Sequence, residues 1–205
     1  GTAAELVTLI NNEGDAGNKV NLDGDFTVSL SDTGSVAAAD LNAISAKTTG
    51  NITATTITAI TGTASEIATL ISDEADSGNG VNLAANVKAT VTGYVAAADL
   101  ITINNGTTGL ITATGVTTIT GTAAAVKAVI DAEADTGNAI NLDTDFTVTV
   151  DAGTAAGADL NTIDAATTGL ITATGVTTIT GTAAELVTLI NNEGDAGNKV
   201  NLDGD

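Results

Sequence analysis

The chain has 205 residues and a formal net charge of −20, because 25 Asp and Glu side chains face only five Lys, and it contains no His, Cys, Pro, Met or Trp. A charge of this sign repels nucleic-acid phosphates and anionic membrane surfaces, and the composition excludes Ser–His and Cys–His catalysis. No apolar run approaches the ~18 residues of a membrane-spanning helix. With Phe26, Tyr94 and Phe146 as the only aromatic residues, we expect an aliphatic core.

A repeat of about 60 residues organises the chain. Residues 1–25 recur letter for letter at 181–205, and related openings begin at Gly62 and Gly121. A period of this length indicates a repeat protein whose core extends along an axis. We therefore treat 1–205 as a single array with no polar cap at either end. Such ends would present strand edges and apolar surface, so we expect a window on a longer repetitive chain or a subunit that stacks into a fibre.

Each repeat divides at an internal glycine into a long and a short half-unit. The half-units are predicted to begin at Gly1, Gly34, Gly62, Gly93, Gly121, Gly153 and Gly181.

A helix is predicted at the start of each long half-unit. In the first, Thr2 and Glu5 have capping-box spacing, and Leu6, Leu9 and Ile10 fall on one face. Thr63 and Glu66 repeat the capping pattern. The residues predicted to end these helices are Gly17, Gly78 and Gly137.

Short half-units carry a shorter version of the same helix. Apolar pairs such as Leu41 and Ile44 recur with one-face spacing in each of them. The residues predicted to end the short helices are Gly50, Gly109 and Gly169.

Strands follow the helices. Residues 19–30 and 110–120 alternate β-branched with polar or small residues, and a bend interrupts each run. The bend is either a hairpin turn or a solenoid corner. A half-unit is therefore predicted to read helix, strand, bend, strand.

The fold class that this pattern predicts is α/β, as a right-handed α/β solenoid built from two helix–strand–strand half-units per repeat. Two strands at ~4.8 Å match one helix at ~8–10 Å, which favours a nearly straight rod with helices along one side of one sheet. A triangular coil with two separate parallel sheets is the alternative. The sequence leaves open whether neighbouring strands are parallel or antiparallel.

Acidic bends are the candidate metal sites. Asp23 and Asp25, and likewise Asp143 and Asp145, pair carboxylates two residues apart, and calcium prefers such hard oxygen ligands. The bend at 84–86 has no acid, and the EF-hand spacing is absent. Asp is also simply a good turn former, so a purely structural role is the alternative. An exact copy of the first bend lies at 203–205.

A second acidic series follows the long helices, where a carboxylate is unfavourable against the helix dipole and invites a cation. The alternative is a hydrated acidic face. Its members are Glu13, Asp15, Asp73, Glu74, Asp76, Asp131, Glu133 and Asp135.

Threonine pairs suggest a rival binding function. Thr53 with Thr55, and their counterparts at 112 and 114 and at 172 and 174, lie two apart, so they share one face of a strand. A flat ladder of exposed threonines could bind ice. The alternative is that Thr is a good residue for the solvent face of a strand.

Residues 158–186 read ADLNTIDAATTGLITATGVTTITGTAAEL. This block resembles repeat segments of very large secreted surface proteins of cyanobacteria and other aquatic bacteria, and the likeness covers essentially the whole chain. It implies an extracellular adhesive, sheath or filament role. The calcium-binding repeats that often accompany such segments are missing here, so no functional residue carries over.

We therefore expect a structural segment of an extracellular filament, sheath, surface layer or giant adhesin, and no enzyme. The expected partners are copies of the chain itself, end to end and laterally, without nucleic acid or membrane insertion. The only cofactor considered is calcium. The alternative function is a ligand-binding solenoid for ice, or for calcium and polysaccharide.

Overall fold

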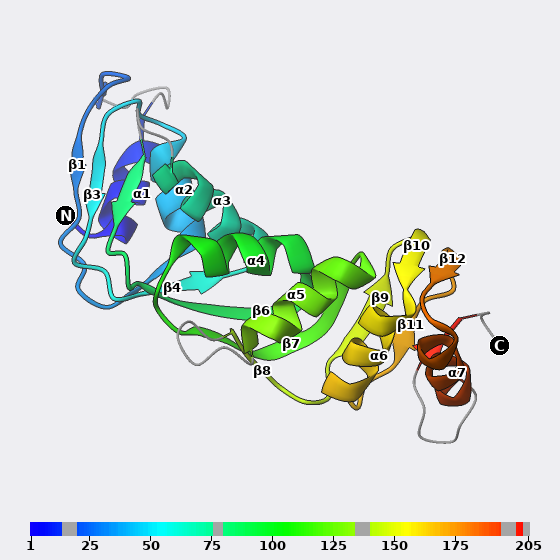
Figure 1. Ribbon diagram of the computed structural model, residues 1–205. Coiled ribbons are helices and arrows are strands. Elements are labelled where there is room, and N and C mark those ends of the chain that lie inside the picture. Colours follow the sequence, from blue (N-terminus) through cyan, green and yellow to red (C-terminus); the bar gives the residue numbers. More distant parts are fainter. Residues whose placement is uncertain (14–19, 76–79, 134–139, 194–199, 203–205) are drawn as a thin grey trace. The chain divides into compact units, whose positions relative to one another are not determined.

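A computed structural model describes the chain except for residues 14–19, 76–79, 134–139, 194–199 and 203–205. The chain forms two compact units (Figure 1). The first comprises residues 1–90 and 102–111, and the second comprises residues 91–101 and 112–205. The boundary therefore falls within two strands and one helix.

The described residues form helices and mostly parallel strands, so the fold is α/β. The helices are α1 (Ala3–Asn11), α2 (Ala38–Ser45), α3 (Ala64–Ala75), α4 (Ala97–Gly106), α5 (Ala123–Glu133), α6 (Gly157–Ala166) and α7 (Ala183–Asn192). The strands are β1 (Val28–Ser29), β2 (Ser35–Ala37), β3 (Ile52–Ala54), β4 (Ala59–Gly62), β5 (Val81–Leu83), β6 (Lys88–Ala96), β7 (Ile111–Gly121), β8 (Ile140–Leu142), β9 (Thr147–Val150), β10 (Gly153–Ala156), β11 (Ile171–Thr172), β12 (Val176–Thr180) and β13 (Val200–Asn201). None of these helices has both the length and the apolar character to cross a membrane.

The predicted capping boxes are confirmed. In α1 the Glu5 N–H donates to Thr2 Oγ1 at 3.3 Å, and the Thr2 N–H donates to the Glu5 carboxylate at 2.9 Å. The same reciprocal pair recurs before α3 and before α7. Because α5 has Ala125 where the others have Glu, only the Thr122 half of its box remains. The glycines predicted to end the long helices lie outside the described residues.

In the first unit, β1, β3 and β5 form one parallel sheet in which Val28, Ile52 and Val81 are neighbours. A second parallel pair, β2 with β4, belongs to a different sheet. Because both pairings are parallel, the bends in this unit are not hairpin turns.

The second unit repeats this arrangement. Val148, Ile171 and Val200 are neighbours on β9, β11 and β13, while β10 pairs with β12 in a separate sheet. Within each unit the strands thus fall into two sheets, whereas the preferred prediction placed them in one.

One feature of the half-units was predicted wrongly. Each short half-unit was expected to open on its helix, but β2 and β10 precede α2 and α6. The reason is that residues 35–37 form an extended strand that pairs with β4, and residues 153–156 form one that pairs with β12. Gly153 enters this strand with a φ of +121°, a region that favours glycine over every other residue.

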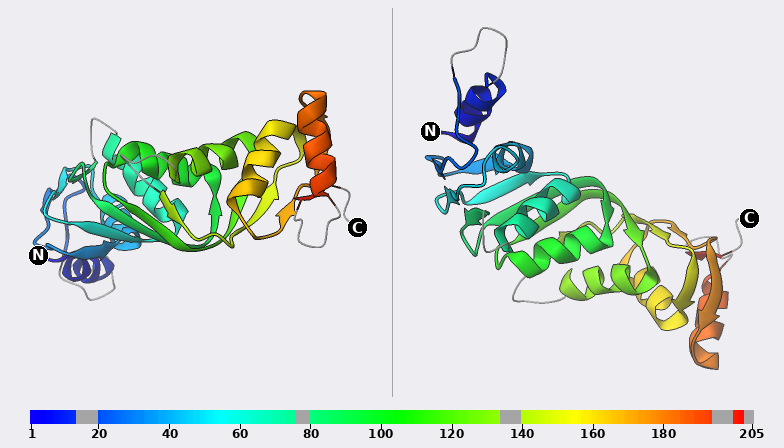
Figure 2. Two further views of the ribbon diagram at one scale, coloured as in Figure 1. Left: turned by 60° about the horizontal axis from the view of Figure 1, so that its bottom comes forward. Right: turned by 90° about the horizontal axis from the view of Figure 1, so that it is seen from above.

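Helices pack against helices in a row. In the first unit α2 contacts both α1 and α3, and in the second α6 contacts both α5 and α7 (Figure 2). The Asn42 side-chain N–H donates to the Glu66 carbonyl at 2.9 Å, and Asn161 makes the same bond to Glu185 at 3.0 Å. Leucine and isoleucine fill the space beneath. The fully buried side chains include Leu41, Ile44, Ile67, Leu70, Leu100, Ile103, Ile111 and Ile119.

A Thr-Thr-Gly segment after each short helix clasps the preceding bend. In the middle copy, Thr107 Oγ1 donates to the Val87 carbonyl at 2.5 Å and accepts from the Gly109 N–H at 2.9 Å. The Thr108 N–H donates to the Ala85 carbonyl at 2.8 Å. The same three contacts recur at 48–50 and at 167–169. We call this arrangement the Thr-Thr-Gly clasp.

The clasp explains the glycines that were predicted to end the short helices, and that prediction was wrong. Helix α2 ends at Ser45, five residues before Gly50. A Cβ on Gly50 would lie 2.4 Å from the Phe26 carbonyl oxygen, and one on Gly109 would lie 2.3 Å from that of Val87. Glycine is therefore needed for close approach of two backbones and not for a left-handed helix end.

Gly109→Ala should consequently destabilise the fold by ~1–3 kcal/mol, because the added methyl group meets a backbone carbonyl that cannot turn away. Chemical denaturation would measure the loss. Gly34→Ala is the matched control, since a Cβ there meets nothing within 4 Å. Equal stability of the two variants would contradict the clasp.

Candidate functional site

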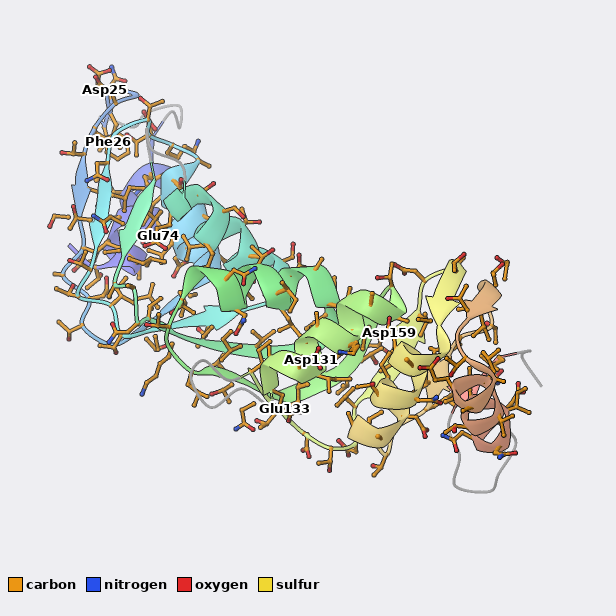
Figure 3. The ribbon with its side chains drawn as sticks, viewed as in Figure 1. Asp25, Phe26, Glu74, Asp131, Glu133 and Asp159 are labelled. Carbon is orange, nitrogen blue, oxygen red and sulfur yellow. The ribbon has the colours of Figure 1, made fainter. Side chains whose placement is uncertain are left out.

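The acidic bends lie at the tips of the strand corners. Asp23 and Asp25 are exposed, and Figure 3 shows Asp25 at the outer end of its bend with Phe26 behind it. The bend's backbone faces the clasp, since the Gly24 and Phe26 carbonyls accept from Thr49 and Thr48. The Asp23 and Asp25 carboxylates are therefore exposed to solvent.

The second acidic bend has the same form. Asp143 and Asp145 are exposed, and Asp143 Oδ1 accepts from the Thr144 N–H at 2.8 Å. That local bond is the turn-forming role that competes with metal binding. The third bend, at 203–205, lies outside the described residues.

Among the residues that the structure describes, no group of three or more acidic side chains comes together to hold a metal ion. Calcium takes six to eight oxygen ligands, and each bend brings two carboxylates from this chain. Calcium at Asp23, Asp25, Asp143 and Asp145 therefore stays a prediction, which would need backbone oxygens, water or a neighbouring copy to complete the ligand set.

Part of the second acidic series has a structural task that the sequence did not reveal. The Leu22 N–H donates to the Glu13 carboxylate at 3.3 Å, and the Leu202 N–H donates to Glu193 at the same distance. Glu74 accepts from Leu83, and Glu133 accepts from Leu142. One acid per repeat thus binds the backbone N–H of a leucine nine residues later, and Leu83 and Leu142 of this set lie in strands β5 and β8. Of the other members, Asp73 accepts from the Ser45 hydroxyl at 3.1 Å and Asp131 pairs with Lys127 at 2.6 Å. Asp15, Asp76 and Asp135 lie outside the described residues.

Burial raises the pKa of two of these acids, Glu74 and Glu133. Desolvation raises the pKa of Glu74 above its ordinary value of 4.5, and the Leu83 N–H opposes this only in part. Glu133 has its pKa raised for the same reason, against the Leu142 N–H. Glu5 shows the opposite effect, because the backbone and side chain of Thr2 donate to its carboxylate and lower its pKa. The pKa of Glu5, near the start of α1, is thus shifted in the opposite direction to those of Glu74 and Glu133, near the ends of α3 and α5.

A hollow of about 510 Å³ lies beside Glu74 in the first unit. Its lining residues are Ile71, Ser72, Glu74, Thr102, Asn105 and Gly106. Figure 3 labels Glu74 among the side chains of this unit. One carboxylate with amide and hydroxyl neighbours can hold a small polar molecule, but it supplies no nucleophile paired with a base.

Most of the threonine pairs predicted to form a ladder do not lie within one strand. Thr53 lies in β3 and Thr172 in β11, but Thr55 and Thr174 lie beyond the ends of those strands. Only β7 contains a complete predicted pair, at 112 and 114.

Other threonines come together instead, in the second unit. Strand register places Thr118 beside Thr147, and Thr120 beside Thr149, which is followed by Thr172. Their neighbours Ile119, Val148 and Ile171 are buried, so the threonines share the opposite face of the sheet. We call these five residues the threonine face. Several of its hydroxyls are already bonded: Thr118 to Thr147 at 2.9 Å, and Thr120 to the Val95 carbonyl at 3.3 Å.

Sequence reasoning missed the clasp threonines, although the signal was present. Thr-Thr-Gly occurs in every short half-unit, at 48–50, 107–109 and 167–169. Comparison of the chain with protein-family models, curated proteins and solved structures gives no match.

The raised pKa values predict how stability changes with pH. Because Glu74 and Glu133 bind a proton more tightly when folded, their contribution favours the folded state below about pH 4.5 and is lost as pH rises through the folded pKa. Glu74→Gln should therefore be at least as stable as the parent at neutral pH, and its stability should depend less on pH between about 4.5 and 7. Urea unfolding at several pH values measures this.

Glu5→Gln provides the control of opposite sign. Its pKa is lowered by folding, so its contribution is present at neutral pH and is lost on acidification through the folded pKa. A Glu74→Gln variant that behaves like Glu5→Gln would contradict the assignment.

Proposed function

We propose that this chain is a structural repeat segment of an extracellular bacterial filament, sheath, surface layer or giant adhesin. In this proposal its repeats form a right-handed α/β solenoid that stacks into a longer rod. The segment works as a spacer and as a lateral contact surface, without catalysis. The resemblance to secreted surface-protein repeats points the same way.

The observation that carries the proposal is the recurrence of the same polar contacts at the repeat spacing. The clasp occurs at 48–50, 107–109 and 167–169, and the Glu-to-Leu tie begins at Glu13 and recurs once per repeat. These recurring contacts join a Thr or Glu side chain to backbone groups elsewhere in the fold. Because the recurring polar groups bind other parts of the same fold, they suit a structural protein that holds neighbouring repeats together.

The charge distribution supports the same role. Exposed acids lie at the bends and along the helices, where they keep a long rod hydrated and separate from its neighbours. Such a surface makes assembly sensitive to salt, since screening shortens the range of repulsion to ~8 Å at physiological ionic strength.

Assembly of the purified chain tests the proposal. We expect rods in electron micrographs and a sedimentation coefficient that rises with protein concentration and with added NaCl. Monodisperse 205-residue chains at every concentration and salt level would overturn it. Adding calcium at ~1 mM, with and without a chelator, tests the acidic bends in the same samples, because extracellular calcium modules bind in that range. A calcium effect that NaCl or Mg²⁺ reproduces would be screening and not a site.

Binding of ice is the second candidate function, and the register of the threonine face is the observation that favours it. Two neighbouring strands carry Thr118 beside Thr147 and Thr120 beside Thr149, which is a regular array of hydroxyl and methyl groups. The bonds within the array reduce the number of hydroxyls that are available to order water.

Ice-crystal shape decides this candidate. If the threonine face binds ice, crystals grown in the protein solution should become faceted, and Thr149→Lys at the exposed centre of the face should abolish the faceting. Thr154→Lys, an exposed threonine on β10 outside the face, is the control. Unfaceted crystals with the parent protein would end the ice-binding hypothesis.

A further inference from the structure

We propose that the hollow beside Glu74 in the first unit binds a small organic ammonium ion. This binding function goes beyond the proposed structural role and does not depend on assembly of the chain. All of the residues that line the hollow belong to the same compact unit, so the site is complete within it.

The hollow lies where two helices end. Ile71, Ser72 and Glu74 come from the C-terminal part of α3, and the other three lining residues come from the C-terminal part of α4. Neither helix has a basic residue in its last turn. A helix C-terminus carries a partial negative charge and favours a cation close to the last turn. Two such ends beside one carboxylate therefore favour a positively charged ligand.

Two of the polar groups on the wall are hydrogen-bond acceptors. Glu74 accepts from the Leu83 N–H, which uses one of the roughly four acceptor positions of a carboxylate. The Ser72 hydroxyl donates to the Ala68 carbonyl at 2.8 Å, so its oxygen remains an acceptor. An alkylammonium group has three N–H donors and no acceptor, and it therefore matches these oxygens. An anionic ligand would instead be repelled by the carboxylate.

The fold gives the Glu74 charge no cation partner. Among the described residues, the recorded ion pair joins Lys127 to Asp131, and it lies in the other unit. Burial raises the pKa of the Glu74 carboxyl group, because the ionised form loses water that the Leu83 N–H replaces only in part. A bound ammonium group would offset this cost of burying the charge.

The remainder of the hollow suits a short hydrocarbon chain. Its volume is about 510 Å³, and the buried Ile71 side chain forms part of its wall. Gly106 lies directly against this side chain, since an added Cβ would collide with the Ile71 Cγ2 methyl group. We therefore expect an alkyl chain of a few carbons to contact Ile71 while its ammonium group approaches Glu74.

The α4 side of the hollow is particular to one repeat. Asn105 and Gly106 stand in the middle short half-unit, and their counterparts in the first and third are Ala46 with Lys47 and Ala165 with Ala166. The hollow is thus not a feature that every repeat needs for its fold.

The α3 side, in contrast, has a close counterpart that provides a control. Glu133 of the next repeat also accepts from a leucine N–H, and burial raises its pKa as well. It does not line this hollow. Replacing Glu133 therefore removes the same charge from the chain without touching the proposed site.

Titration of the full chain with n-butylammonium chloride tests the proposal. In proton–nitrogen NMR spectra, the backbone amide signals of Asn105 and Gly106 should shift and saturate. The expected dissociation constant is on the order of 1 mM for a ligand of this size. Glu74→Gln should raise that constant at least about tenfold, since it removes the charge but keeps an oxygen for the Leu83 N–H. Glu133→Gln should leave it unchanged.

Three further ligands separate the charge of the ammonium group from other causes. NaCl at equal ionic strength and n-butanol at equal concentration should give no saturable shift of these two signals. CaCl₂ should give none either, because one carboxylate supplies too few of the six to eight oxygen ligands that calcium takes. The n-butanol comparison uses the parent chain, so it decides the role of charge even if Glu74→Gln does not fold.

Several results would overturn the proposal. Equal losses of affinity in Glu74→Gln and Glu133→Gln would show that the net charge of −20 attracts the cation without a site. Saturation by n-butanol would make the hollow merely apolar, and saturation by calcium would make it a metal site. An absence of saturable shifts with n-butylammonium would leave no site at all. None of these results bears on filament assembly, which is measured separately.

Discussion

The close approach between each bend and the Thr-Thr-Gly segment one half-unit later is the constraint on which the rest of the structure depends. Carbonyl groups at the bend need donors: in the middle copy the Thr107 hydroxyl donates to the Val87 carbonyl, and the Thr108 N–H donates to the Ala85 carbonyl. Gly109 and its counterparts allow the two backbones to meet, because any Cβ would collide with the carbonyls. The clasp fixes the distance between successive half-units. Within each unit their strands pair in parallel, and their helices pack in a row.

Carboxylates illustrate how the same residue type takes different roles along one helix. At the start, Glu5 accepts from the exposed first turn and its pKa falls. At the end, Glu74 is drawn towards the strand that follows, and burial raises its pKa despite the Leu83 N–H. An acid near a helix C-terminus is unfavourable against the dipole. The bond from a leucine N–H nine residues later offsets this, and it recurs in every repeat.

Identical sequences need not have identical surroundings in a repeat protein. Leu9 and Leu189 have the same neighbours in sequence, yet one is partly exposed and the other is buried, because α1 packs on α2 whereas α7 packs on α6. The burial of a residue in such a chain is decided by the adjacent repeats. The same reasoning explains why Val200 and Asn201 form a strand while Val20 and Asn21 do not.

The sequence alone determined the 60-residue period, the helices with their Thr–Glu capping boxes, the alternation of the strands and the aliphatic core. These depend on local spacing, which a pattern of residue types records directly. Tertiary structure decided the parallel pairing, the division of each unit's strands into two sheets, the clasp, the role of Glu74 and the grouping of Thr118 with Thr147. Apart from the Glu74 contact, each of these joins residues from different half-units. The distance between half-units depends on backbone contacts such as that of Gly109 with Val87, which no local pattern specifies.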